Sequence, residues 1–177
     1  HLYRRRQRQM CIRDRIPVEE ALSKIKAAVD AREDENTMII ARTDARAIDG
    51  IEAALDRAEA FIEAGADMTF VEAPRSEAEM EMITKRLSVP QVANMVVGGK
   101  TPLTPQARLV ELGFSLILYA NTPLQAAMRA MTDVLNALKL DGDVSSVIDR
   151  LADFDERQRL VDKASYDALE ERYRVAV

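Results

Sequence analysis

The stretch Met38-Ile39-Ile40-Ala41-Arg42-Thr43-Asp44-Ala45 decides the fold class of this chain. A short apolar run, rich in β-branched residues, ends abruptly in an arginine, a threonine and an aspartate. Because helical patterns flank it on both sides, the run predicts a parallel strand over residues 37–41 that is buried rather than half-exposed. Charged residues at the carboxyl end of such a strand lie where open α/β sheets and barrels bind their ligands.

Three later stretches repeat this design of an apolar strand with a polar end. The strands are predicted over residues 67–72, 91–95 and 114–119, and their polar ends are Glu72, Asn94 and Asn121. Counted from Arg42, successive polar ends are 30, 22 and 27 positions apart, which is the length of one strand-plus-helix unit. The sequence therefore predicts a repeated strand-to-helix architecture with its polar chemistry on one rim.

Helical patterns separate and follow the strands. Helices are predicted over residues 17–32, 49–64, 76–87, 104–113 and 122–139, and in the tail over 145–151 and 155–173. Their start signals are a capping box of Asp49 with Glu52, a second box of Ser76 with Glu79, and the N-cap pairs Thr104-Pro105 and Thr122-Pro123. Gly65 and Gly113 are predicted to end their helices, because glycine readily adopts the left-handed conformation that terminates many helices.

Four strands alternating with helices predict an α/β fold made of parallel βαβ units. A complete barrel of eight units needs about 250 residues, whereas the repeat here occupies residues 16–140. The repeat therefore forms either a small open sheet or the C-terminal half of a TIM-type (β/α)8 barrel. The half-barrel would leave an unpaired strand at each side of the sheet. Residues 141–177 form a helical extension without a further strand.

The composition excludes several classes of protein. Of 177 residues, 47% are hydrophobic and 31% charged, as in an ordinary globular domain, and no apolar stretch reaches the roughly 20 residues of a membrane span. The single Cys11 and the single His1 exclude an internal disulfide framework, a Cys- or His-ligated metal site and a Ser-His-Asp triad. With no Trp and 5% aromatic residues, a base-stacking nucleic-acid surface is not expected. We expect a cytoplasmic protein.

The charge is distributed unevenly. Residues 1–15 contain six Arg and one Asp, so the rest of the chain holds 19 of the 25 basic and 29 of the 30 acidic residues. A basic arm on an acidic body is one pattern for nucleic-acid or membrane contact. However, residues 1–15 show neither a helical nor a strand period and resemble translated sequencing-adapter read-through. We interpret them as a segment that is not native, and we leave them out of the fold.

Three motifs at the predicted strand ends resemble the isocitrate lyase and phosphoenolpyruvate mutase superfamily. They are Ile40-Ala41-Arg42-Thr43-Asp44-Ala45, Phe70-Val71-Glu72-Ala73-Pro74 and Asn94-Met95-Val96-Val97-Gly98-Gly99-Lys100-Thr101-Pro102. The resemblance runs from Ile16 to Tyr173, and it is greatest to methylisocitrate lyase-like and carboxyvinyl-carboxyphosphonate phosphorylmutase-like members. It implies a (β/α)8 barrel whose C-terminal helices are exchanged between subunits of a homo-oligomer.

The resemblance also implies a chemistry. Similar enzymes form or cleave a C–C or C–P bond beside a 2-oxo-acid through an enolate held by Mg²⁺. Their metal-holding aspartates and their Lys-Lys/Arg-Cys-Gly-His gating loop belong to the first half of the barrel, and Cys11 does not match that loop. We therefore expect an N-terminally truncated family member that contains no metal ligands, and we expect no lyase activity from this chain alone.

The family match assigns roles to residues at the strand ends. Arg42 and Glu72 are the predicted catalytic residues, and they bind a small carboxylate substrate together with Asn94, Met95 and Val96. Asp44 and Thr101 are predicted to hold these residues in place without contacting the substrate themselves.

A structural explanation stands beside each of these roles. The planar guanidinium of Arg42 can bind a substrate carboxylate, but it can equally form a structural ion pair with Asp44 or Glu72. The Asn94 amide can donate to an oxyanion or cap the end of its strand, and Asp44 can simply cap the next helix. Gly98-Gly99-Lys100-Thr101 lacks the spacing of a phosphate-binding loop, so we interpret it as a mobile rim loop.

The resemblance leaves several functions open. The first is a Mg²⁺-dependent carbon–carbon lyase acting on a 2-hydroxy di- or tricarboxylate, like 2-methylisocitrate lyase. Gln125 departs from the Arg that such enzymes tend to have there, which weakens the case for a tricarboxylate. The alternatives are an oxaloacetate decarboxylase, a phosphonate mutase or hydrolase, and a catalytically inactive module that only associates with partner subunits. No nucleic-acid or membrane partner is expected.

Overall fold

The computed structural model describes residues 16–174, so the segment 1–15 that was predicted not to be native lies outside the described residues. The chain divides into two compact units, one ending at Thr122 and one beginning at Pro123. The domain boundaries predicted after residues 15 and 140 stay predictions. No described helix is long and apolar enough to cross a membrane.

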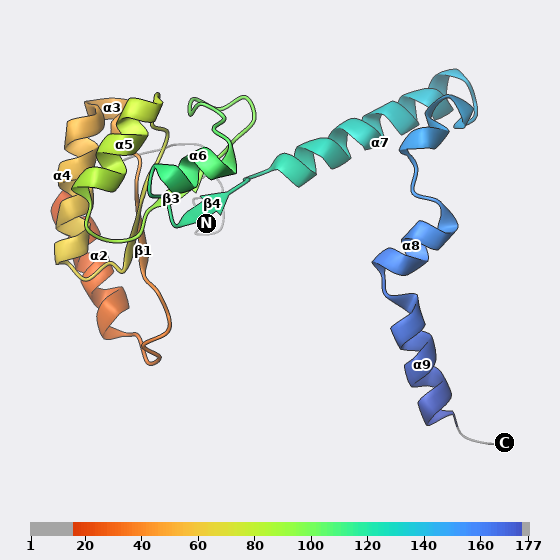
Figure 1. The fold of residues 1–177 in the computed structure, drawn as a ribbon, viewed down its shortest axis with the longest axis horizontal. Coiled ribbons are helices and arrows are strands. Elements are labelled where there is room, and N and C mark those ends of the chain that lie inside the picture. The colour runs from red at the N-terminus through yellow and green to blue at the C-terminus, as the bar shows by residue number, and fades with distance from the viewer. Residues whose placement is uncertain (1–15, 175–177) are drawn as a thin grey trace, which may run out of the picture. The chain divides into compact units, whose positions relative to one another are not determined.

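The first unit contains four parallel strands in chain order (Figure 1). Strands β1 (Ile40–Thr43) and β2 (Met68–Val71) form one parallel pair, and β3 (Val92–Asn94) and β4 (Leu116–Leu118) form the other. A parallel bridge between Thr69 and Gln91 joins the two pairs. The predicted parallel α/β architecture is therefore confirmed, with β1 and β4 at the outer edges of the sheet.

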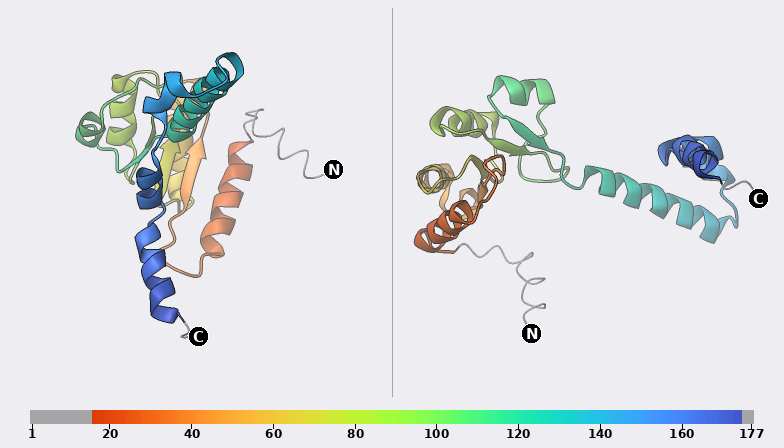
Figure 2. Two further views of the ribbon diagram at one scale, coloured as in Figure 1. Left: turned by 90° about the vertical axis from the view of Figure 1, so that its right-hand side faces the viewer. Right: turned by 90° about the horizontal axis from the view of Figure 1, so that it is seen from below.

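Helices cover one face of these strands (Figure 2). They are α2 (Val18–Asp30), α3 (Arg46–Asp49), α4 (Ile51–Glu63), α5 (Glu77–Arg86) and α6 (Gln106–Glu111). The largest core cluster lies between the strands and α4, α5 and α6, and its fully buried members include Leu55, Met80, Ile83 and Leu109. Ala54, Leu55 and Ala58 form the side of α4 that is buried in this cluster.

The opposite face of the strands differs from the prediction. Strand β1 was predicted to be buried on both sides, but its residues alternate, so that Ile40 and Arg42 are exposed while Ala41 and Thr43 are buried. Leu116 and Leu118 of β4 are also exposed. The reason is geometric, because side chains alternate along a strand and the described helices of this unit pack on only one face. β1 also begins later than predicted, since the Asp67 carboxylate binds the Ile39 N–H at 2.7 Å before the ladder starts.

Two of the predicted helix N-caps are not formed in the structure. The Asp49–Glu52 capping box is wrong, because Asp49 ends the short helix α3 and α4 follows Gly50 without a side-chain cap. Thr104 is not an N-cap, since α6 begins at Gln106 and the Thr104 hydroxyl contacts the Met80 sulfur instead. The Ser76 cap of α5 is confirmed, and its hydroxyl accepts the Glu79 N–H at 3.2 Å.

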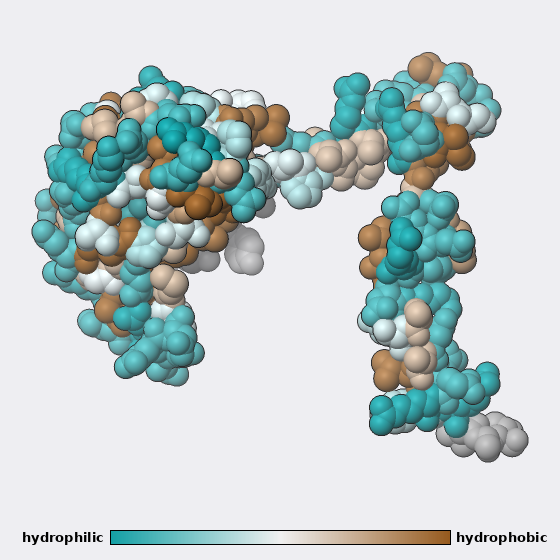
Figure 3. Space-filling model, viewed as in Figure 1, coloured by the Kyte–Doolittle hydropathy of each residue, from teal (hydrophilic) through white to brown (hydrophobic). Residues whose placement is uncertain are grey.

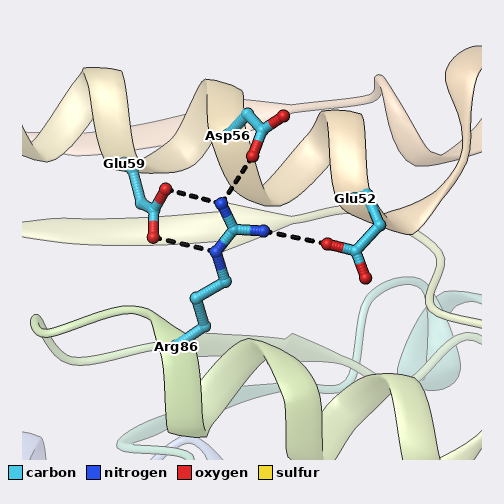
Figure 4. A network of polar contacts seen from close by, with 4 residues as sticks. All are labelled: Glu52, Asp56, Glu59 and Arg86. Atoms are coloured by element: carbon cyan, nitrogen blue, oxygen red, sulfur yellow. Dashed lines mark hydrogen bonds and ion pairs between the residues drawn. The ribbon is translucent and has the colours of Figure 1, made fainter.

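One arginine links α4 to α5 at the surface (Figure 4). Arg86, in the last turn of α5, donates to Glu52, Asp56 and Glu59, which follow one another along one side of α4. These carboxylates raise the pKa of Arg86, chiefly through the hydrogen bonds from Glu59 and Asp56. Arg86 thus stays charged and holds together two helices that both pack on the sheet.

The second unit is helical in its described part. It consists of α7 (Thr122–Leu140), the 3₁₀ helix η1 (Ser145–Arg150), α8 (Phe154–Leu160) and α9 (Lys163–Tyr173). The single helix predicted over residues 155–173 is broken, because Asp162 adopts a left-handed conformation with φ 51°. Hydrophobic residues lie at the surface of this unit (Figure 3), among them Leu135, Phe154 and Leu160.

Gly65 is a glycine that the fold requires. Its φ is +102°, and a Cβ added there would lie 3.1 Å from the Val29 Cγ2 of α2. We expect Gly65→Ala to lower the free energy of unfolding by more than the roughly 1–2 kcal/mol of the left-handed backbone alone, because Val29 must also move.

Urea denaturation measures this loss. Gly98→Ala is the matched control, because Gly98 also has a positive φ of +77° but no atom within 4 Å of the added Cβ. Equal losses for the two variants would show that the contact between α2 and Gly65 is not tight.

Candidate functional site

The strand register brings polar residues together at the carboxyl edge of the sheet. Arg42 pairs with Phe70, and Asn94 pairs with Leu118. Since Thr69 pairs with Gln91, Glu72 and Asn94 are neighbours on adjacent strands. Side chains two positions apart share a face, so Arg42, Asp44, Glu72 and Asn94 all belong to the face opposite the helices.

Arg42 is the centre of this group. Its Nε and Nη2 donate to one Asp44 oxygen at 3.1 and 2.9 Å, and Nη2 lies 3.4 Å from Glu72 Oε2. The guanidinium also stacks over the Phe70 ring, 4.9 Å from its centroid. The side chain is 43% exposed, so one surface of the guanidinium stays open to solvent. Arg42 is therefore held in one orientation and still accessible to an anion.

Glu72 and Asn94 form the more enclosed side of the group. The Glu72 side chain is 12% exposed, and it accepts a 3.4 Å hydrogen bond from Asn94 Nδ2. The Asn94 Oδ1 is buried and has no hydrogen-bond partner among the described residues. Flipping the amide would point that oxygen at the Glu72 carboxylate, so the orientation with nitrogen toward Glu72 is the favourable one. An unpaired buried acceptor costs about 1–3 kcal/mol and marks a place for a donor.

The backbone beside Glu72 is strained. Ala73 has a φ of +59°, and Asn121, which follows β4, has a φ of +63°. Such conformations are unfavourable for residues with a Cβ, and they persist where surrounding contacts hold them. Both residues lie just beyond the carboxyl ends of strands, the edge at which Arg42, Glu72 and Asn94 meet.

The structure brings some of the predicted site residues together and leaves others apart. Arg42, Asp44, Glu72 and Asn94 meet, and the ion pairs expected of a purely structural Arg42 are also present. Met95 is 1% exposed and belongs to the core on the helix side, so its predicted contact with a substrate gains no support. Val96 begins the turn that Gly99 closes by donating to the Val96 carbonyl. The hydrogen bonds, ion pairs and ring contact of Arg42 go to Asp44, Glu72 and Phe70 rather than to Val96 or Thr101.

A second charged pair, which sequence patterns did not reveal, lies next to this group. Arg46 donates to both oxygens of Glu79, with the Nε contact at 2.8 Å, and both side chains are largely buried. The hydrogen bond from Arg46 lowers the pKa of Glu79. Arg46 lies only two residues after Asp44, but a capping role already explained Glu79 in the sequence, so nothing there pointed to the pair.

The described residues do not fit a magnesium site. No three His, Cys, Asp or Glu side chains between residues 16 and 174 gather so that they could hold a metal ion. Asp44 and Glu72, the carboxylates of the site, both pair with Arg42. A cation there would compete with the guanidinium and be repelled by it. The charges of this group therefore suit an anion better than a metal ion.

Comparison with known proteins identifies the family. The family model described as phosphoenolpyruvate phosphomutase matches residues 7–139, a range that includes the whole sheet and begins within the segment predicted not to be native. The chain belongs to this family of enzymes, within the isocitrate lyase and phosphoenolpyruvate mutase superfamily.

The curated relatives include lyases and a mutase. The chain is 44% identical over 161 residues to the chloroplastic carboxyvinyl-carboxyphosphonate phosphorylmutase of Arabidopsis thaliana, covering 89% of this chain and 48% of the relative. It is 41% identical to 2,3-dimethylmalate lyase of Eubacterium barkeri, covering 91% and 56%, and 39% identical to 2-methylisocitrate lyase of Bacillus subtilis, covering 85% and 48%. The chain thus spans about half the length of the curated relatives it matches.

Solved structures agree with this family. A crystal structure of 2,3-dimethylmalate lyase matches with a TM-score of 0.76 and 30% identity, covering 87% of this chain and 56% of that one. Phosphonopyruvate hydrolase in complex with oxalate and Mg²⁺ matches with a TM-score of 0.75 and 28% identity, covering 89% and 56%. The sheet and its helices are therefore those of the superfamily.

The lowered pKa of Glu79 gives a pH-dependent prediction. A carboxylate whose folded-state pKa lies below its ordinary value of 4.5 adds stability above that pH, and this stability is lost as the pH falls through the folded-state pKa. We expect Glu79→Gln to reduce the free energy of unfolding by about 2 kcal/mol at pH 7, because the charge-assisted bonds to Arg46 are lost. The difference from wild type should shrink below pH 4.5.

Urea denaturation from pH 3 to 7 measures this difference. Glu77→Gln is a suitable control on the same helix, because Glu77 pairs with Arg108 at the exposed surface, where ion pairs add little. A Glu79→Gln deficit that stays constant down to pH 3 would contradict the link between the ion pair and stability.

Proposed function

We propose that this chain is the C-terminal half of a (β/α)8 barrel that cleaves a carbon–carbon bond in a 2-hydroxy di- or tricarboxylate. The observation that supports this most is the meeting of Arg42, Glu72 and Asn94 at the carboxyl edge of a parallel sheet, because active sites of such barrels lie at that edge. The lyase names of the relatives at 39–41% identity support the same reaction class.

In this proposal Arg42 binds a carboxylate or the oxyanion that develops beside it. Its guanidinium is already oriented by Asp44 and stacked on Phe70, so little side-chain freedom is lost when an anion arrives. An anion approaching the exposed surface of the guanidinium meets a positive group that cannot lose its proton. In this proposal Asp44 supports Arg42 by holding its guanidinium in place.

Glu72 and Asn94 contact the hydroxyl side of the substrate in the same proposal. Asn94 Nδ2 carries two hydrogens and Glu72 takes one of them, which leaves one to donate to a substrate oxygen. Glu72, partly enclosed and a short distance from Arg42, is placed to accept the proton of the substrate hydroxyl as the bond beside it breaks. The unpaired Asn94 Oδ1 accepts a hydrogen from a different donor, such as a bound water.

The remaining parts of the proposed enzyme lie outside the described residues. The exposed face of β1 and β4 and the two free sheet edges suit a further four strand-and-helix units that close a barrel. Since the residues that the structure describes do not fit Mg²⁺, the proposal places its carboxylate ligands on those units. The metal would supply charge stabilisation to the enolate of the 2-oxo-acid product. A cytoplasmic location remains a prediction.

Oxalate binding tests the site in this chain, since oxalate has charged oxygens on two adjacent carbons, like the carboxylate and enolate oxygens of a 2-oxo-acid enolate. We expect the purified chain to bind oxalate in calorimetric titrations and Arg42→Ala to weaken binding about 10- to 100-fold, because a charge-assisted bidentate contact is lost. The oxalate affinity of Arg42→Lys should lie between those of wild type and Arg42→Ala, since lysine keeps the positive charge but not the planar guanidinium. With Mg²⁺ and 2,3-dimethylmalate or 2-methylisocitrate, the chain alone should show no turnover.

The matched control is Arg108→Ala, because Arg108 also forms ion pairs with two carboxylates, Glu77 and Glu111, at the surface of the same unit. Equal oxalate affinity for wild type and Arg42→Ala would show that Arg42 is only structural. Measurable Mg²⁺-dependent turnover by the chain alone would show that the metal ligands are present after all.

We further propose that the chain associates with other copies through its C-terminal helices. Five apolar residues of α7 recur at alternating intervals of four and three positions and are 46–64% exposed, namely Leu124, Met128, Met131, Leu135 and Leu138. This spacing is the pattern of a helix face that packs against another helix or a sheet. An exposed apolar stripe of this length supports an interface.

Charged substitutions on this stripe test the association. We expect the paired change Met128→Glu and Leu135→Glu to lower the mass measured by analytical ultracentrifugation to that of one chain, because burying two carboxylates in an apolar contact is strongly unfavourable. Arg129→Glu, at an exposed position of the same helix, should leave the mass unchanged. An unchanged mass for the double variant would exclude α7 from the interface.

A further inference from the structure

We infer that Glu79 is a positioning residue for the proposed site, because it fastens the two loops that present Arg42 and Glu72. This inference rests on the proposed function for its biological meaning. Its geometry, however, stands on a part-buried ion pair between Arg46 and Glu79 and on a hydrogen bond from the Arg75 backbone to Glu79. Glu79 itself lies on α5, and its carboxylate contacts the loops that follow β1 and β2.

One side of Glu79 holds the loop after β1. Arg46 forms a two-pronged contact with the carboxylate, and the side chains are only 12% and 16% exposed. Arg46 begins α3, directly after Asp44 and Ala45, and Asp44 is the residue that holds the Arg42 fork. Because a bidentate contact fixes both distance and orientation, Glu79 limits how far the Asp44 loop can move.

The other side of Glu79 holds the loop after β2. Its Oε2 accepts the Arg75 backbone N–H at 2.8 Å. Arg75 follows Pro74 and the strained Ala73, which in turn follow Glu72. A positive φ at an alanine persists only where neighbouring contacts hold it. The hydrogen bond to Arg75 is such a contact, placed immediately after the strained turn.

The two attachments close a ring of interactions. From Glu79 the path runs through Arg46 and the adjoining backbone to Asp44, from there to Arg42, and across a 3.4 Å contact to Glu72. It returns through the strained turn to the Arg75 N–H and Glu79. The base of the ring is rigid, because Ser76 caps α5 at the Glu79 N–H and the next residue, Met80, is fully buried.

Substitution of Glu79 tests this role by comparison with a residue on the same helix. Glu79→Gln removes the charge paired with Arg46 but keeps an oxygen that the Arg75 N–H can reach. Glu79→Asp keeps the charge but shortens the side chain, so the carboxylate reaches only one of the two loops. Glu77→Gln is the control, because it breaks an exposed contact with Arg108 and touches neither loop.

The measurements are ¹⁵N-resolved NMR of the Arg42 Nε–H and Asn94 side-chain amide resonances, and oxalate titration of the same samples. We expect Glu79→Gln to move both resonances and to weaken oxalate binding about tenfold, with Glu79→Asp intermediate and Glu77→Gln within twofold of wild type. Urea denaturation identifies any variant that fails to fold. If Glu79→Gln does not fold, the same resonances and oxalate titrations are measured on Glu79→Asp and Arg46→Lys, and these variants decide whether Glu79 has the positioning role.

The outcomes separate this inference from the proposed function. Folded Glu79 variants with unchanged Arg42 and Asn94 resonances would overturn the positioning role. If wild type does not bind oxalate, the proposed function fails, while the resonances still decide whether Glu79 positions Arg42. Resonances that move in the Glu77 control as much as in Glu79→Gln would show a general effect on α5, and would also overturn the inference.

Discussion

The parallel register of four consecutive strands is the constraint on which the site depends. The ladder pairs Arg42 with Phe70 and, through the Thr69–Gln91 bridge, sets Glu72 beside Asn94. A shift by one residue would turn each of these side chains to the other face, into the core that Leu55, Met80 and Leu109 already fill. Packing of the helices on one face therefore fixes the chemistry of the other face.

Charge is arranged around this register in two layers. Toward solvent, Arg42 lies between Asp44 and Glu72 and remains partly exposed, so it is balanced but open to an anion. Behind it, Arg46 and Glu79 form an enclosed pair that also binds the backbone after the strained turn at Ala73. The group around Arg42 is suited to ligand binding because it remains accessible to solvent. The Arg46–Glu79 pair is suited to a structural role because each buried charge has a hydrogen-bonded partner of opposite charge.

Several features followed from local rules and several did not. The strand-to-helix repeat, the Ser76 cap and the family motifs were all predicted, since each depends on residues close in sequence. The Asp49 cap, the Thr104 cap and a continuous helix over residues 155–173 were wrong, because Asp49 ended α3, Thr104 turned toward Met80, and Asp162 adopted a left-handed conformation. In each case a neighbour or a backbone angle that the pattern does not encode decided the outcome.

The sequence by itself determined the class of fold, the edge at which polar residues gather, and the family, because hydrophobic periodicity and short motifs are local properties. Only the tertiary structure decided which residues share a face and how their charges pair. It separated Met95 from Asn94, its neighbour in the chain, because successive side chains of a strand point in opposite directions. It also joined Arg46 to Glu79 across 33 positions, a contact that forms only when α5 packs against the loop after β1.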